Sequence, residues 1–282
     1  MPLGLPLALL FKRSFEESRL PQEWLEANVT PLFKKGNSAD PGNYRPVSLT
    51  SVVGKVMERI IKQDLMDHLN KHKLITNNQH GFVKGRACVT NLLETMDFTT
   101  ESMASNEWVD LLFLDFAKAF DKVPHNRLIL KLKGYGISGK LLDWIRAFLS
   151  NRKQRVVLGE HKSKWTEVKS GVPQGSVLGP ILFIIYINDL SDLISNVCKI
   201  YADDTKVLAR IRRAFIAEDV LRLQSDIDAI REWTSKWLMK LNISKCKIMH
   251  IGKKNPRATY TMKCYDTEDH VIERFEAIST SQ

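Results

Sequence analysis

The chain has 282 residues, of which 44% are hydrophobic and 26% are charged, as is ordinary for a globular protein. This length allows one large domain or two small ones, and neither an internal repeat nor a low-complexity tract is present. The net charge of +10 favours a polyanionic partner such as a nucleic acid, because basic side chains on phosphates release condensed counterions. A basic surface without such a partner gives the same composition.

The sequence shows no framework for a zinc site, for disulfides or for a membrane anchor. The four cysteines lie outside any C-x-x-C pair, so we expect reduced thiols in an intracellular protein, in either the nucleus or the cytoplasm. The apolar residues 1–10 lack the basic start and the cleavage site of a signal peptide, and the apolar residues 177–190 are too few to span a bilayer. The cysteines are Cys88, Cys198, Cys246 and Cys264.

The first predicted elements are helical. Residues 21–30 predict a short helix that enters a loop over residues 34–45, which is rich in Lys, Gly, Asn and Pro. Over residues 53–69, apolar side chains recur at steps of three and four, which predicts a helix capped by Thr50 or Ser51.

The central part of the chain mixes strands and helices. Residues 108–116 are nearly all apolar and predict a strand buried on both faces. Residues 141–149 predict an amphipathic helix capped by Ser138. Residues 155–158 and 165–169 predict a hairpin.

The last third of the chain also contains both helices and strands. A helix is expected after Ser176, and residues 199–202 and 206–209 predict two short strands. A long helix over residues 218–241 precedes a final strand at residues 246–251. Because strands and helices interleave irregularly, we predict an α+β fold with a mainly antiparallel sheet packed on helices.

Three aspartates stand at the ends of these strands. Asp115 closes the apolar strand, and Asp203 and Asp204 lie between the two short ones. Carboxylates at the ends of buried strands are costly unless a cation neutralises them, and Mg²⁺ prefers oxygen ligands of this kind. Two such ions about 3.5–4 Å apart stabilise both the attacking and the leaving oxygen of a phosphoryl transfer. Alternatively, the aspartates only terminate a strand and mark a turn.

The surrounding motifs carry a family resemblance. Residues 113–121 (FLDFAKAFD), 171–180 (GVPQGSVLGP) and 201–204 (YADD) resemble, in this order, the catalytic motifs of reverse transcriptases. Four further phrases are similar to LINE-type (non-LTR), jockey-like retrotransposons, and the resemblance runs from about Trp24 to Gly252. These phrases are NYRPVSL at 43–49, QHGF at 79–82, KVPH at 122–125 and NISKCK at 242–247.

The resemblance implies the fingers and palm of a right-hand polymerase, with an antiparallel sheet backed by helices. It divides the chain into a helical leader (1–23), fingers with template-contacting loops (24–107), palm (108–252) and a divergent tail (253–282). A thumb is expected to be missing, and endonuclease activity is expected from a domain that this sequence lacks.

The resemblance also implies RNA-directed DNA polymerisation with two Mg²⁺ ions, for which Mn²⁺ is a possible substitute. Asp115 and Asp203 would bind both ions with the backbone carbonyl of Phe116, and Asp204 would lie beside them. The partners would be an RNA template, a DNA primer and dNTPs. Lys245 would protonate the departing pyrophosphate, or it simply faces solvent.

The remaining roles concern the incoming nucleotide. Phe120 would pack under the deoxyribose and exclude a 2′-hydroxyl, or it is a core residue. Gln174 and Gly175 would touch the nucleotide and template, since glycine allows close backbone approach. Arg45, with Lys34 or Lys35, would reach the triphosphate.

Some residues are expected to have only structural roles. Asp121 is expected to start a helix. The tryptophans Trp233 and Trp237 are expected in the core, and His80 and His125 are expected to make local hydrogen bonds.

Two other functions stay open. One is a catalytically silent remnant that binds nucleic acid through its basic surface. The other is a viral RNA-dependent RNA polymerase, against which Phe120 argues.

Overall fold

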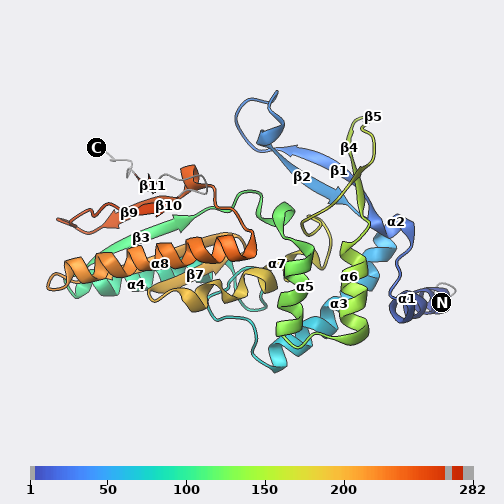
Figure 1. Cartoon of the computed structure of the whole chain (residues 1–282), viewed down its shortest axis with the longest axis horizontal. Coiled ribbons are helices and arrows are strands. Elements are labelled where there is room, and N and C mark those ends of the chain that lie inside the picture. The colour runs from blue at the N-terminus through green and yellow to red at the C-terminus, as the bar shows by residue number, and fades with distance from the viewer. Residues whose placement is uncertain (1–3, 264–268, 276–282) are drawn as a thin grey trace. The chain divides into compact units, whose positions relative to one another are not determined.

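The computed structural model describes residues 4–263 and 269–275, which form two compact units (Figure 1). Unit 1 contains Met1–Leu74 and Phe120–Tyr186, and unit 2 contains Ile75–Ala119 and Ile187–Gln282. Each unit is therefore built from two separate stretches of chain. In the described part of the chain, no helix is both long and apolar enough to cross a membrane.

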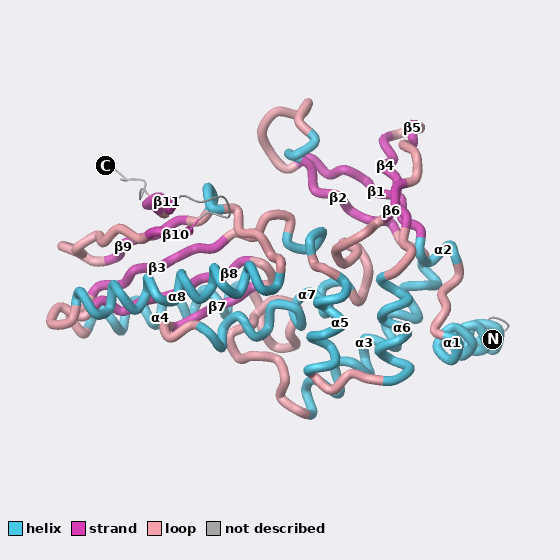
Figure 2. The backbone as a smooth tube through the Cα atoms, in the orientation of Figure 1, coloured by secondary structure: helices cyan, strands magenta, loops and turns pink. Residues whose placement is uncertain are grey.

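Unit 1 packs helices next to a small mixed sheet (Figure 2). In this sheet, β1 (Glu26–Phe33) pairs antiparallel with β2 (Tyr44–Leu49) and parallel with β4 (Lys153–Leu158). Short strands β5 (His161–Lys162) and β6 (Thr166–Glu167) pair antiparallel with β4, which confirms the predicted hairpin. The helices are α1 (Gly4–Glu17), α2 (Gln22–Leu25), α3 (Val52–Lys71), α5 (His125–Gly134), α6 (Gly139–Leu149) and α7 (Gly179–Ile187), with 3-10 turns η1 (Pro41–Asn43) and η2 (Ala119–Lys122).

The predicted helix over residues 21–30 is largely wrong. The helix α2 ends at Leu25, and the chain continues as β1, in which Ala27 and Val29 are buried and alternate with more exposed neighbours. Pro31 has no backbone N–H to donate, which disfavours continuation of a helix. In β1 it lies beyond Val29, the last residue that pairs with β4, so only β2 borders the strand at this point. At this position every second side chain is buried, as in a strand, rather than every third or fourth, as in a helix.

Helix α3 confirms the prediction for residues 53–69, with Ser51 as its cap: Ser51 Oγ accepts a hydrogen bond from the Gly54 backbone N–H at 3.3 Å. The apolar residues Val56 and Ile60 nevertheless stay partly exposed, whereas Glu58 is buried. The buried face of α3 is formed by Gly54, Met57, Glu58, Ile61, Leu65 and Leu69.

Unit 2 is built on a second sheet. Its strand order is β12 (Glu273–Arg274), β9 (Lys247–Ile251), β3 (Trp108–Leu114), β8 (Asp204–Ile211) and β7 (Val197–Tyr201). All neighbours are antiparallel except β12 and β9, and β10 (Thr261–Lys263) pairs separately with β11 (Asp269–Val271). These strands confirm the predicted α+β class and the antiparallel sheet.

Two long helices pack on this sheet. Helix α4 (Cys88–Ala104) contacts β3 and β7, and α8 (Ile216–Trp237) contacts β8 and β10 (Figure 1). Two 3-10 turns, η3 (Asn188–Leu193) and η4 (Ile243–Lys245), complete the unit. Trp233 is buried and contacts Phe116 edge to face, which confirms its place in the core, whereas Trp237 is half-buried.

The central strand β3 is buried, as predicted, although it ends at Leu114 rather than at residue 116. It contains an unpredicted buried carboxylate, because Asp110 is fully buried in the middle of the strand. Its oxygens contact His250 Nδ1 (2.7 Å), Asn255 Nδ2 (2.9 Å) and the Tyr260 hydroxyl (2.6 Å). Burial and the Asp110 charge both raise the pKa of Tyr260. This network attaches the segment after β9, from Asn255 to Tyr260, to the sheet.

Candidate functional site

The three predicted catalytic aspartates lie at one end of the unit 2 sheet. In the antiparallel pair of β3 and β8, Leu114 lies opposite Thr205, so Asp115 comes one position beyond the last pair on one strand and Asp204 on the other. Strands β7 and β8 are joined by the two-residue turn of Ala202 and Asp203, across which Tyr201 pairs with Asp204. The register of three strands thus brings these carboxylates together.

The negative charges of Asp203 and Asp115 both act on Asp204. Partial desolvation raises the pKa of Asp204 above its usual value, and the negative charges of Asp203 and Asp115 raise it further. A divalent cation with oxygen preference would relieve this repulsion, so the donor chemistry fits Mg²⁺. Among residues 4–263 and 269–275, however, no three His, Cys, Asp or Glu side chains are arranged so that they could hold a metal ion.

The segment before β9 brings a lysine to the same end of the sheet. The backbone N–H groups of Ala117 and Asn242 donate to the carbonyls of Lys240 and Asp115, both at 2.8 Å, and so form an antiparallel bridge between Phe116 and Leu241. These two hydrogen bonds do not use the Phe116 carbonyl. Through this attachment, Lys245 Nζ lies 3.9 Å from Asp115 Oδ1. The lysine side chain is 64% exposed, so it is accessible to a substrate.

In unit 1, the loop that contains Gln174 and Gly175 packs on β2. The Ser48 backbone N–H donates to the Gln174 carbonyl at 2.7 Å. A Cβ atom on Gly175 would lie 2.3 Å from the Ser48 carbonyl oxygen, and the φ of Gly175 is +114°. Only glycine fits both the short distance to Ser48 and the positive φ without strain. The absence of a side chain at Gly175 therefore allows the loop backbone to lie directly against β2.

The same loop also contacts the segment that carries Phe120. The Val172 backbone N–H donates to the Phe120 carbonyl at 2.8 Å, and Gln174 Nε2 donates to Asp121 Oδ1 at 3.1 Å. Asp121 does not start a helix as expected, because it is the third residue of the four-residue turn η2, and its carboxylate instead orients Gln174. The ring of Phe120 stacks on the buried Phe183 ring with 4.4 Å between centroids. Phe120 thus packs on the core with one face and stays partly exposed.

Arg45 and Lys34 share one face of the β1–β2 ladder. Arg45 lies opposite Leu32, and Lys34 follows β1 two positions later, so both side chains fall on the same side of the pleat. Both are exposed. Lys34 still bonds the neighbouring chain, because its backbone N–H donates to the Asn43 carbonyl at 2.9 Å, whereas Lys35 lies in the bend that follows.

Comparison with known proteins decides the family. The model of the family described as Reverse transcriptase (RNA-dependent DNA polymerase) matches residues 33–270, which is most of the chain and extends beyond Gly252. The chain belongs to this family.

The reverse transcriptase domain is similar to proteins of non-LTR retrotransposons. It is 32% identical to the RNA-directed DNA polymerase from mobile element jockey of Drosophila melanogaster, and 30% identical to the probable polymerase from transposon X-element of the same organism. Each match covers 85% of this chain and 27% of the relative. The chain therefore spans about a quarter of the length of the curated relatives that it matches.

Solved structures support the fold of this reverse transcriptase domain. Apo telomerase from Candida tropicalis, truncated from its C-terminal domain, superposes with a TM-score of 0.60 at 12% sequence identity, over 92% of this chain and 56% of that one. Telomerase from the same organism with a fragment of telomeric RNA gives a TM-score of 0.58 at 11% identity. At such identities the likeness concerns the fold alone.

The reverse transcriptase domain also contains a buried glutamate that the sequence did not reveal. Glu58 Oε2 of α3 accepts the backbone N–H groups of Val177 (2.7 Å) and Leu178 (3.0 Å), directly before α7. Burial raises the pKa of Glu58, although these two hydrogen bonds and the charge of the buried Arg152 oppose the rise. His125 supports the other end of this loop, since its Nε2 lies 2.8 Å from the Gly171 carbonyl oxygen; this hydrogen bond is not the local one expected, because it joins residues 46 positions apart.

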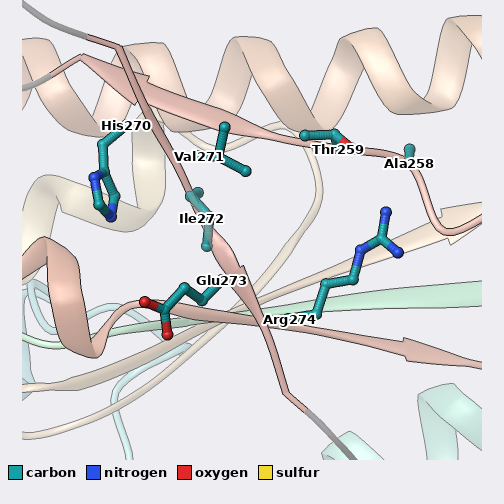
Figure 3. A pocket seen from close by; sticks show the side chains of 7 residues that line it. All are labelled: Ala258, Thr259, His270, Val271, Ile272, Glu273 and Arg274. Carbon is teal, nitrogen blue, oxygen red and sulfur yellow. The ribbon is translucent and has the colours of Figure 1, made fainter.

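A cavity in unit 2 is lined by residues other than the candidate catalytic ones. Its volume is about 530 Å³, and none of the three aspartates lines it. Figure 3 shows its lining side chains on two segments, on either side of residues 264–268, which the structure does not describe. The lining residues are Ala258, Thr259, His270, Val271, Ile272, Glu273 and Arg274.

Proposed function

We propose that the chain catalyses RNA-directed DNA synthesis, adding deoxynucleotides to a DNA primer on an RNA template. One observation carries this proposal: Asp115, Asp203 and Asp204 all lie at the same end of the antiparallel sheet in unit 2. Membership of the reverse transcriptase family supports it.

In this proposal, Asp115, Asp203, Asp204 and the Phe116 carbonyl hold two Mg²⁺ ions, or Mn²⁺ in their place. Such ions lower the pKa of the primer 3′-hydroxyl and neutralise charge on the triphosphate when they are bound. Lys245 donates a proton to the departing pyrophosphate, since its ammonium group already lies near Asp115. The assignment of residues 24–107 to fingers and 108–252 to palm belongs to the same proposal.

The groups proposed to recognise the nucleotide all belong to unit 1. The guanidinium of Arg45 and the ammonium of Lys34 bind the triphosphate from one face of the β1–β2 ladder. Gln174, oriented by Asp121, and the exposed backbone at Gly175 contact the base pair. The exposed face of Phe120 packs under the deoxyribose, while Phe183 supports its other face.

A catalytically silent, nucleic-acid-binding remnant is the second candidate function. The observation that favours it is the surplus of basic side chains, which suits a polyanionic partner with or without catalysis. The net charge of +10 would then serve binding alone.

Single-nucleotide incorporation tests the proposed function. Purified protein should extend a DNA primer on an RNA template by one deoxynucleotide with Mg²⁺, and a chelator should abolish the extension. One addition requires no movement along the template, so it isolates the chemistry. If folded protein binds primer–template and extends nothing with either Mg²⁺ or Mn²⁺, the silent remnant is correct and the proposal is wrong.

Replacement of Phe120 with valine should relax sugar selection. Because the valine side chain leaves room for a 2′-hydroxyl, the ratio of kcat/KM for dNTP over rNTP should fall by about 10–100-fold. Phe148→Val, which removes a buried aromatic ring of α6 in the same unit, is the matched control and should lower stability without changing this ratio. Equal loss of dNTP and rNTP use in Phe120→Val would instead make Phe120 a core residue only.

A further inference from the structure

The turn that presents Asp203 has an unfavourable backbone conformation. Ala202 has a φ of +56°, in the left-handed region that a side chain with a Cβ disfavours. Ala202 is also buried, with 6% of its surface exposed. A turn of this kind persists only where its surroundings hold it, so its supports determine where the next residue, Asp203, is placed.

The support comes from residues 78–81, which are distant in sequence. The Gln79 side-chain oxygen Oε1 accepts hydrogen bonds from the backbone N–H groups of Ala202 (3.0 Å) and Gly81 (2.7 Å). Since both partners are donors, they determine which end of the amide is the oxygen. Gln79 is 1% exposed, and its Nε2 has no hydrogen-bond partner within the described parts of the chain. The oxygen therefore makes the polar contacts of this side chain.

Further backbone contacts keep this support in register. The backbones of His80 and Ile200 are joined at 2.8 Å, and the Ile200 N–H donates to the Asn78 carbonyl at 2.8 Å, so residues 78–80 run along β7. A Cβ atom on Gly81 would lie 2.4 Å from the Ala202 nitrogen. The Gln79 backbone is itself fixed, because Arg86 donates to its carbonyl at 2.8 Å.

We propose that Gln79 is a positioning residue that holds Ala202 in its left-handed conformation and so places the Asp203 and Asp204 carboxylates. It acts through the backbone of the turn and touches neither substrate nor metal. The inference rests on the proposed function for its effect on catalysis, but its effect on the turn is independent of catalysis.

The test replaces Gln79 with methionine, which has similar length and lacks the amide oxygen. Gln79→Met should lower kcat for single-nucleotide incorporation and the affinity for Mn²⁺ by about 10–100-fold, as is typical for residues that orient metal ligands. The Kd for primer–template should not change. Gln224→Met is the matched control, since Gln224 also bonds a backbone in unit 2, that of Thr261, and should affect neither quantity.

Two readouts separate positioning from general stability. Amide hydrogen exchange over residues 200–206 should accelerate in Gln79→Met and not in Gln224→Met. Adding Ala202→Gly to Gln79→Met should restore most of the lost kcat, because glycine adopts the left-handed conformation without support. If Gln79→Met does not fold, Gly81→Ala provides the same exchange measurement, since its new Cβ displaces the Ala202 nitrogen.

The outcomes distinguish the two proposals. Unchanged exchange over residues 200–206 in Gln79→Met overturns the positioning role, and so does a loss of kcat that Ala202→Gly does not restore. If the wild type incorporates no nucleotide and exchange still accelerates, the proposed function is wrong while Gln79 still positions the turn.

Discussion

Replacing Asp203 with alanine is expected to reduce single-nucleotide incorporation by about a thousandfold or more, which corresponds to roughly 4 kcal/mol of lost transition-state stabilisation. Asp203 occupies the two-residue turn between β7 and β8, next to Asp204, whose pKa its negative charge raises. Because these like charges repel one another, removing one of them should not destabilise the fold. The loss should appear in kcat, with primer–template affinity unchanged.

Asp192→Ala is the matched control for this prediction. Asp192 is an exposed aspartate of η3 in the same unit and has no proposed part in catalysis. It should incorporate nucleotide at the wild-type rate. Incorporation by Asp203→Ala within about tenfold of wild type, a barrier change of only about 1.4 kcal/mol, would show that the turn is not part of the catalytic site.

Replacing Gly175 with alanine is expected to damage both stability and nucleotide use. The new Cβ would lie 2.3 Å from the Ser48 carbonyl oxygen, so the loop must move away from β2 and lose the hydrogen bond from Ser48 to the Gln174 carbonyl. Strain at this φ of +114° costs about 1–3 kcal/mol. A shift of about 1 Å at a substrate-positioning group lowers the rate by about a hundredfold, so kcat/KM for dNTP should fall by that order.

Gly159→Ala is the control that introduces backbone strain without a steric clash. Gly159 has a φ of +58° in the same unit, and an added Cβ would meet no atom within 4 Å. This variant should lose about 1–2 kcal/mol in chemical denaturation and keep the wild-type kcat/KM. If both glycine variants lose the same stability and neither loses activity, the loop at Gly175 takes no part in nucleotide binding.

The sequence was sufficient wherever one local pattern determines an element. The periodicity of α3, the apolar run of β3 and the short strands on either side of Asp203 and Asp204 all predicted their elements within a few residues. The prediction for residues 21–30 was wrong because a short amphipathic segment fits both the helical and the strand periodicity. Only its pairing with β2 and β4 makes the segment a strand.

The buried polar residues that support the strands and loops could not be predicted from local sequence patterns. Gln79, Glu58 and Asp110 act on partners more than a hundred positions away, so nothing near them in the sequence marks their burial. Helix α4 was not predicted, because its buried face carries polar residues such as Asn91 and Thr95. Its apolar residues, including Leu92, are exposed instead, which reverses the usual amphipathic pattern.

The pairing of β3 has a consequence for how the chain folds during synthesis. Val109 of β3 pairs with Arg210 of β8 on one side and with Ile251 of β9 on the other. At a ribosomal rate of about 5–20 residues per second, the apolar strand waits roughly 5–20 s for its first neighbour and longer for its second. During this interval both of its edges are unpaired and open to association with other chains. Nascent protein that stalls before β9 should therefore depend on chaperones or aggregate.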